Sequence, residues 1–149
     1  MTDRTGADGD TVKLLRECDS GIKMGISSID QVLERVENTN FKELLINAKN
    51  QHLKLLKELN ILLADHYDRG KEPNSMAKGM SWIKTNVMIA ANDSDKTIAD
   101  LMVEGCDMGV KSLSKYLNQY KSADQASKNI TGDIIKVEEE LSQSIRAYL

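Results

Sequence analysis

The sequence has few aromatic residues and almost no proline. Phe, Trp and Tyr make up 4% of its 149 residues, and Pro73 is the only proline. All-β folds depend on aromatic and β-branched runs and on frequent turn residues, so this composition argues against a sandwich or barrel and favours helices. Hydrophobic residues (40%) and charged residues (29%) are typical of a soluble domain with a sizeable core.

Other absences narrow the function. The net charge is −3, so the chain lacks the basic excess that drives nucleic-acid binding. No stretch approaches the roughly 20 apolar residues that a membrane span needs. Residues 1–10 contain no apolar run and do not resemble a signal peptide. We therefore expect a cytoplasmic protein with a flexible tail at residues 1–10 and one domain over residues 11–149.

Cysteine is also scarce. Cys18 and Cys106 are the only two, and no Cys-x-x-Cys pair occurs, which excludes a zinc ribbon or a thioredoxin-type motif. Both lie inside helical patterns. Without an export signal, we expect them to be reduced thiols in the core.

Apolar and small residues recur at spacings of three and four over residues 11–37, 41–69, 95–120 and 123–149, which predicts four helices. Asp10 or Thr11 is expected to cap the first helix and Thr39 or Asn40 the second, while Gly70 caps the end of the second. The predicted inward-facing residues are Leu15, Cys18, Ile22, Gly25, Ile29, Val32 and Val36, then Phe41, Leu45, Ala48, His52, Leu55, Leu59, Leu62 and His66, then Ile98, Leu101, Gly105, Met108, Ser112, Leu113, Tyr116 and Tyr120, and finally Ala126, Ile130, Ile134, Val137, Leu141, Ile145 and Tyr148.

The lengths of the connections between these segments predict how the helices are arranged in the bundle. Short connections at residues 38–40 and 121–124 give two antiparallel hairpins. Between the hairpins, a stripe of Met76, Met80, Ile83, Val87 and Ala90, with Trp82 beside it, predicts a crossover helix of about 16 residues, roughly 24 Å long. Two hairpins joined by a long crossover form a ferritin-like four-helix bundle.

The second half of the chain resembles a known family. The runs Gly79-Met-Ser-Trp-Ile-Lys84, Asn92-Asp-Ser-Asp95 and Glu104-Gly-Cys-Asp107, with the later Tyr116, are similar to those of a bacterial family of ferritin-like four-helix-bundle proteins of unknown function. The likeness extends over residues 14–149. It implies a ferritin-like fold with a tryptophan in the crossover helix, and it implies no reaction.

A ferritin-like bundle raises the question of a di-metal centre. Such centres take a Glu from each of two helices and a Glu-x-x-His pair from each of the other two. The chain has only two histidines, and Lys49 and Leu63 stand three residues before His52 and His66. The standard ligand set is therefore absent.

A degenerate metal site is the alternative. Asp19, together with Glu17, on the first helix, His52 on the second, Glu104 and Asp107 on the third and Glu138 on the fourth could converge on Fe, Mn or Zn. The competing interpretation is that the acids are solvated and that His52 is a buried neutral histidine held by a hydrogen bond. No catalytic or cofactor-binding motif is present: the chain has no nucleophile elbow, no phosphate loop and no Cys with a His nearby.

Two glycine pairs, Gly21-x-x-x-Gly25 and Gly105-x-x-x-Gly109, lie inside predicted helices, where each Gly costs about 1 kcal/mol relative to Ala. They predict either a close approach of two helix backbones or a groove for a bulky side chain such as Trp82. A backbone-lined ligand pocket is the alternative.

The sequence favours a non-catalytic structural or interaction module. Four apolar residues of the second helix lie outside its inward face, which predicts association with further copies of the chain: Leu44, Ile46, Leu53 and Ile61. A metal-binding bundle is the alternative function.

Overall fold

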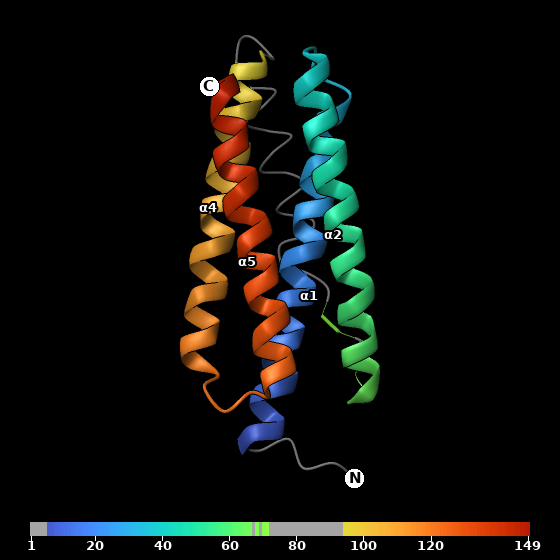
Figure 1. Ribbon diagram of the computed structural model, residues 1–149, viewed down its shortest axis with the longest axis vertical. Coiled ribbons are helices and arrows are strands. Elements are labelled where there is room, and N and C mark those ends of the chain that lie inside the picture. The colour runs from blue at the N-terminus through green and yellow to red at the C-terminus, as the bar shows by residue number, and fades with distance from the viewer. Residues whose placement is uncertain (1–5, 67, 69, 72–93) are drawn as a thin grey trace.

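The computed structural model describes residues 6–66, 68, 70–71 and 94–149, and its regular elements are helices, without a strand in those residues. The helices are α1 (Gly6–Leu33), α2 (Thr39–Asp65), α4 (Asp95–Gln119) and α5 (Gln125–Ile145), followed by the short 3₁₀ helix η1 (Arg146–Tyr148). The predicted all-α four-helix bundle is confirmed (Figure 1). The helix predicted around residues 76–90 lies outside the described residues.

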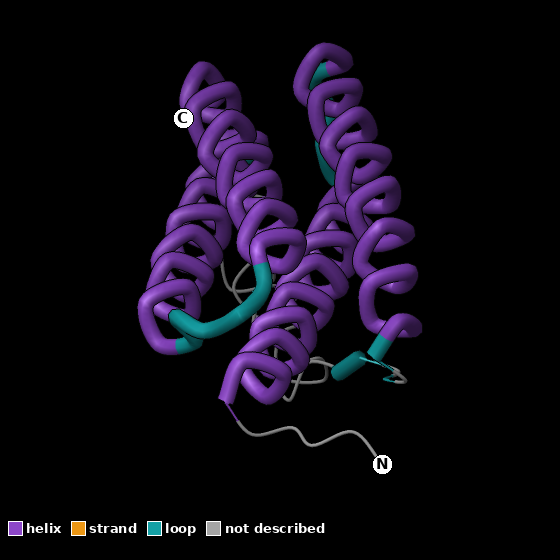
Figure 2. The backbone as a smooth tube through the Cα atoms, turned by 60° about the horizontal axis from the view of Figure 1, so that its bottom comes forward, coloured by secondary structure: helices purple, strands orange, loops and turns teal. Residues whose placement is uncertain are grey.

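The helices form two antiparallel hairpins, α1–α2 and α4–α5 (Figures 1 and 2). Asp95, at the start of α4, accepts hydrogen bonds of 2.9 Å from the backbone N–H groups of Glu37 and Asn38, just beyond α1. At the opposite end, the N–H of Asp124 donates to Thr11 Oγ1 at 2.8 Å. The α2 and α4 helices therefore run in the same direction along the bundle. None of the described helices has the length and apolar character to cross a membrane.

The helix starts differ from the predicted caps. The α1 helix already begins at Gly6, so Asp10 and Thr11 lie inside it and accept instead from the N–H groups of Ser122 and Asp124 in the α4–α5 connection. The side chain that caps α2 belongs to Asn38, which accepts from Phe41 N at 3.0 Å, and not to Thr39 or Asn40. Each of these polar side chains bonds the N–H groups that its position in the fold leaves unpaired.

Two apolar clusters fill the bundle. The upper cluster in Figure 1 includes Ile29, Val32, Phe41, Leu45, Ile98, Met102, Cys106, Leu141 and Ile145. The lower cluster includes Leu14, Leu15, Cys18, Ile22, Leu55, Leu59, Leu63, Leu113, Ile130 and Ile134. Most of the predicted inward-facing residues are buried here.

Some predicted inward positions are wrong. Met108 is 63% exposed, and Gly105, Ser112 and Ala126 are also exposed. The buried row of α4 is rotated instead toward Met102 and Cys106, which point at the apolar residues of α1, α2 and α5. Among the residues predicted to face outward on α2, Leu44 packs partly against the upper cluster, because it neighbours the buried Leu45 and Phe41.

Candidate functional site

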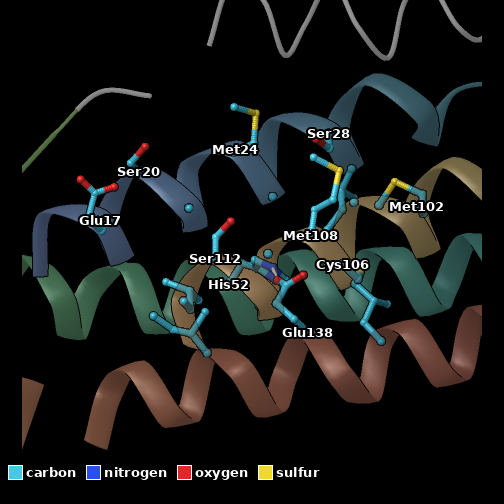
Figure 3. Close-up of a pocket in the computed structure, with 18 of the residues that line it drawn as sticks. Glu17, Ser20, Met24, Ser28, His52, Met102, Cys106, Met108, Ser112 and Glu138 are labelled. Carbon is cyan, nitrogen blue, oxygen red and sulfur yellow. Dashed lines mark hydrogen bonds and ion pairs between the residues drawn. The ribbon is translucent and has the colours of Figure 1, made fainter. Parts of the chain in front are cut away.

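A polar layer separates the two apolar clusters. It consists of Gly25 on α1, His52 on α2, Gly109 on α4 and Glu138 on α5, and is called here the central layer. The His52 side chain is 1% exposed and that of Glu138 is 13% exposed. His52 Nε2 pairs with Glu138 Oε1 (Figure 3). His52 Nδ1 lies 2.7 Å from the carbonyl oxygen of Ala48. The centre of the bundle thus holds one buried acid–base pair.

The hydrogen bonds and charges around His52 favour its protonated form. A carbonyl oxygen only accepts, so Nδ1 of His52 carries a proton that it donates to Ala48. Burial by itself lowers the pKa of His52, but the hydrogen bond and negative charge of Glu138, with the Ala48 carbonyl, outweigh burial and raise that pKa above its ordinary value. The raised pKa favours the form of His52 that has protons on both ring nitrogens and can donate to the Glu138 carboxylate. The predicted hydrogen bond of a buried histidine is present, and the raised pKa shifts the ring away from the neutral form.

Gly25 makes room for the imidazole ring. A Cβ atom at this position would lie 2.9 Å from His52 Nε2 and 3.0 Å from its Cδ2, closer than side chains normally approach. A Cβ at Gly109 would meet Glu138 Oε2 at 4.0 Å, an ordinary contact. Cβ atoms at Gly21 and Gly105 would meet no atom of the described residues within 4 Å. Among the described residues, no backbone of another helix approaches these glycines closely, and all four line a groove.

The groove lies between α1 and α4 and encloses about 480 Å³ (Figure 3). We call it the α1–α4 groove. His52 and Glu138 contribute polar atoms to it, and much of the remaining lining is apolar. Its walls are made largely of small residues and methionines: Ser20, Gly21, Met24, Gly25 and Ser28 on α1, and Met102, Gly105, Met108, Gly109 and Ser112 on α4.

Of the six candidate metal ligands, the structure pairs His52 with Glu138, whereas Glu17 accepts from the ammonium group of Lys71. Asp19 is fully buried, but its Oδ2 binds the ammonium group of Lys23 at 2.8 Å and the N–H of Lys71 at 3.0 Å. Glu104 and Asp107 are exposed, and Asp107 accepts a hydrogen bond from Ser142 Oγ at 2.8 Å. No group of three or more His, Cys, Asp or Glu residues suited to a metal occurs in the described part of the chain.

Both cysteines are free, buried thiols, as the sequence predicts. Burial raises the pKa of Cys18 to about 12, although its hydrogen bond with Thr131 opposes the shift. Thr131 donates its hydroxyl proton to the Ser127 carbonyl, so the Cys18 thiol donates to Thr131. Burial, with the charges of Glu138 and Asp107, also raises the pKa of Cys106. Neither thiol is poised to act as a nucleophile, because the thiolate form is disfavoured at both.

One polar contact was not predicted from the sequence. Gly70 has a φ of 86° and lies so close to Asp19 that any Cβ would overlap the carboxylate. It does not cap α2, which ends at Asp65 with His66 as the C-cap. Gly70 instead lets the chain pass over Asp19, so that Lys71 reaches both Asp19 and Glu17. Gly70 could be recognised in the sequence as a turn residue, but the residue that it contacts, Asp19, lies on another helix.

Comparisons of the chain with protein-family models, with curated proteins and with solved structures gave no match.

Proposed function

We propose that this chain is a non-catalytic interaction module that self-associates through the outer face of α2. The observation that carries the proposal is a row of large apolar side chains on that face: Ile46 is 41% exposed, Leu53 44% and Ile61 62%. We call these three residues the outer stripe. Single exposed apolar residues are common on soluble proteins, but a row along one helix is typical of a covered surface.

The spacing of the outer stripe supports a helix-length contact. At about 100° per residue, positions 46, 53 and 61 fall within roughly a quarter of the helix circumference. Beside Leu53, a shallow depression between α1 and α2 is lined by Ile26 and Leu56, which extends the apolar surface. A second copy of the chain would bring the same stripe, and two-fold pairing of identical surfaces is the commonest form of association.

The central layer supports a role without catalysis. The hydrogen-bonding atoms of the His52 ring are both used, one by Ala48 and one by Glu138. The two thiols are held in the protonated form by burial. Groups with these partners stabilise a folded bundle, whereas a general base or nucleophile needs an accessible atom.

We propose that the helices are connected as in ferritin-like bundles. The α2 and α4 helices run in the same direction, so the connection between them starts at the lower end of the bundle and finishes at the upper end. That requirement supports the long crossover, with its short helix, that the sequence predicts.

Light scattering coupled to size-exclusion chromatography tests self-association. We expect a dimer or larger species for the wild type and a monomer for Leu53→Glu. Gln51→Glu is the matched control, because it adds the same charge to an exposed position of α2 outside the outer stripe, and it should keep the wild-type mass. A wild-type monomer at high concentration would contradict the proposal.

A metal-binding bundle is the second candidate, and one observation favours it. His52 and Glu138 present an imidazole and a carboxylate side by side at the α1–α4 groove, a donor pair that suits Fe, Mn or Zn. Metal analysis of the purified protein tests this candidate. Stoichiometric metal that is lost in His52→Ala would support it over the interaction module.

A further inference from the structure

The outer face of α4 separates its charges along the helix. Asp100 and Glu104 lie in the first half of α4, and Lys111 and Lys115 lie in the second half. All four residues are exposed. At about 100° per residue, they fall within roughly 60° of the helix circumference and so form one row. We call these four residues the charge row.

This separation of charge is unfavourable within the helix itself. Asp100 and Glu104 are like charges four residues apart, as are Lys111 and Lys115, and such pairs destabilise a helix. The helix dipole favours acids in the first turn and bases in the last turn, but the charge row lies outside both turns. In the described part of the chain, none of these four side chains has a hydrogen bond or an ion pair. The charge row therefore calls for a partner.

The charge row is complementary to itself when a second copy is turned end to end. Asp100 and Lys115 are equally far from the midpoint between residues 107 and 108, and so are Glu104 and Lys111. A two-fold axis that crosses α4 at this midpoint places Glu104 of each copy opposite Lys111 of the other, and Asp100 opposite Lys115. Antiparallel pairing thus gives every charge of the row an opposite charge, whereas parallel pairing in register would bring like charges together.

The residues nearest this midpoint are compatible with such a contact. Met108 is 63% exposed and would lie near the same residue of the second copy. Asp107 accepts a hydrogen bond from Ser142 Oγ at 2.8 Å, which holds its carboxylate toward α5. An apolar centre with charged residues around it is the usual composition of an interface between proteins.

We propose that the charge row of α4 is a second self-association surface, which binds the charge row of another copy in antiparallel orientation. The α1 and α5 helices both contact α2 and α4 and lie between them, so the charge row and the outer stripe occupy opposite sides of the bundle (Figure 1). Two-fold contacts on opposite sides can join copies into a chain, whereas the outer stripe alone joins two. The charge row does not depend on the outer stripe, so either proposal can fail while the other holds.

Ionic strength tests the charge row, because salt screens exposed ion pairs. The Leu53→Glu variant lacks the outer-stripe contact, so light scattering of this variant reports the charge row alone. We expect a monomer at physiological salt and at about 1 M salt, and a dimer at about 10 mM salt, where screening extends over about 30 Å. The net charge of −3 repels copies most strongly at low salt, so association there requires specific contacts between opposite charges.

Charge reversal in the Leu53→Glu background tests the pairing. Glu104→Lys and Lys111→Glu should each abolish the low-salt dimer, because each brings like charges together. A mixture of these two variants should dimerise again, since every altered charge then meets an opposite one. Glu140→Lys is the matched control and should keep the dimer: Glu140 is exposed and stands two residues from Ser142, which places it on the side of α5 away from α4.

Three results would overturn the proposal. If Leu53→Glu remains a monomer at about 10 mM salt, the charge row does not bind a second copy. A low-salt dimer that persists after Glu104→Lys must use another surface. If each reversal abolishes the dimer but their mixture does not restore it, the two copies are not paired Glu104 to Lys111.

Discussion

The two apolar clusters and the central layer between them are stabilised in different ways. In the clusters, side chains such as Leu15, Leu59 and Ile134 are buried among many similar neighbours. Burial of apolar area provides the stability there, so any side chain of similar volume can serve. In the central layer, His52 depends on two specific partners, Ala48 and Glu138, and Gly25 is required because the ring occupies its space. The central layer therefore requires particular residues at particular positions, whereas the clusters require only apolar side chains of suitable size.

Removing one member of the central pair should have the largest effect. His52→Ala leaves the carboxylate of Glu138, 13% exposed, without its charged partner. We expect the free energy of unfolding in urea to fall by about 3–5 kcal/mol. Replacing both members, His52→Leu with Glu138→Leu, should cost much less, because no buried charge remains unpaired. Equal losses for the single and the double variant would contradict the assignment of a buried ion pair.

Adding a methyl group to the central layer should have the next largest effect. In Gly25→Ala, the new Cβ displaces the imidazole ring, and we expect a loss of about 1–3 kcal/mol in urea unfolding despite the better helix propensity of Ala. Gly132→Ala has open space on α5 and should gain about 1 kcal/mol. If both substitutions stabilise the protein, the ring is not packed against Gly25.

The pH dependence of stability should report the charged pair. The pKa of His52 is raised in the folded state, so the pair contributes fully below the pKa of an unfolded histidine, about 6.5. Its contribution then decreases as the pH rises through the higher pKa of folded His52. Urea unfolding between pH 6 and pH 9 should show this loss in the wild type and in His66→Gln. A loss that persists in His52→Gln would assign it to another group.

Added metal should have the smallest effect. Nε2 of His52, the nitrogen that would bind a metal, is already engaged with Glu138, and Asp19, Glu104 and Asp107 lie elsewhere. We therefore expect no shift of the melting temperature with Fe(II), Mn(II) or Zn(II). An increase of several degrees that vanishes in His52→Ala would favour the metal-binding bundle.

The clusters could be predicted from the sequence, and the central layer could be predicted only in part. Alternating spacings identified the inward rows of α1 and α2, because burial depends on the face of a helix and the face depends on local spacing. The same rule placed His52 inside. It could not select Glu138 as its partner, since the two residues lie 86 positions apart and several other acids were equally available.

The wrong predictions also arose where a residue depends on partners far away in the sequence. Met108 was predicted to face inward from its spacing, but the glycines of α4 turn that side of the helix toward the groove. Asp10 and Thr11 look like a helix cap, yet their partners are the N–H groups of a connection more than a hundred residues away. Local sequence identifies a polar side chain that needs a partner, and the fold decides which partner it meets.

NMR of the imidazole nitrogens of His52 at neutral pH, before and after addition of Zn(II), tests the account of the central layer most directly. We predict two protonated ring nitrogens, one hydrogen-bonded to Ala48 and one to Glu138, whose signals do not change when the metal is added. A neutral ring with one unprotonated nitrogen, or a signal that moves with stoichiometric Zn(II), would contradict the account and identify His52 as a metal ligand.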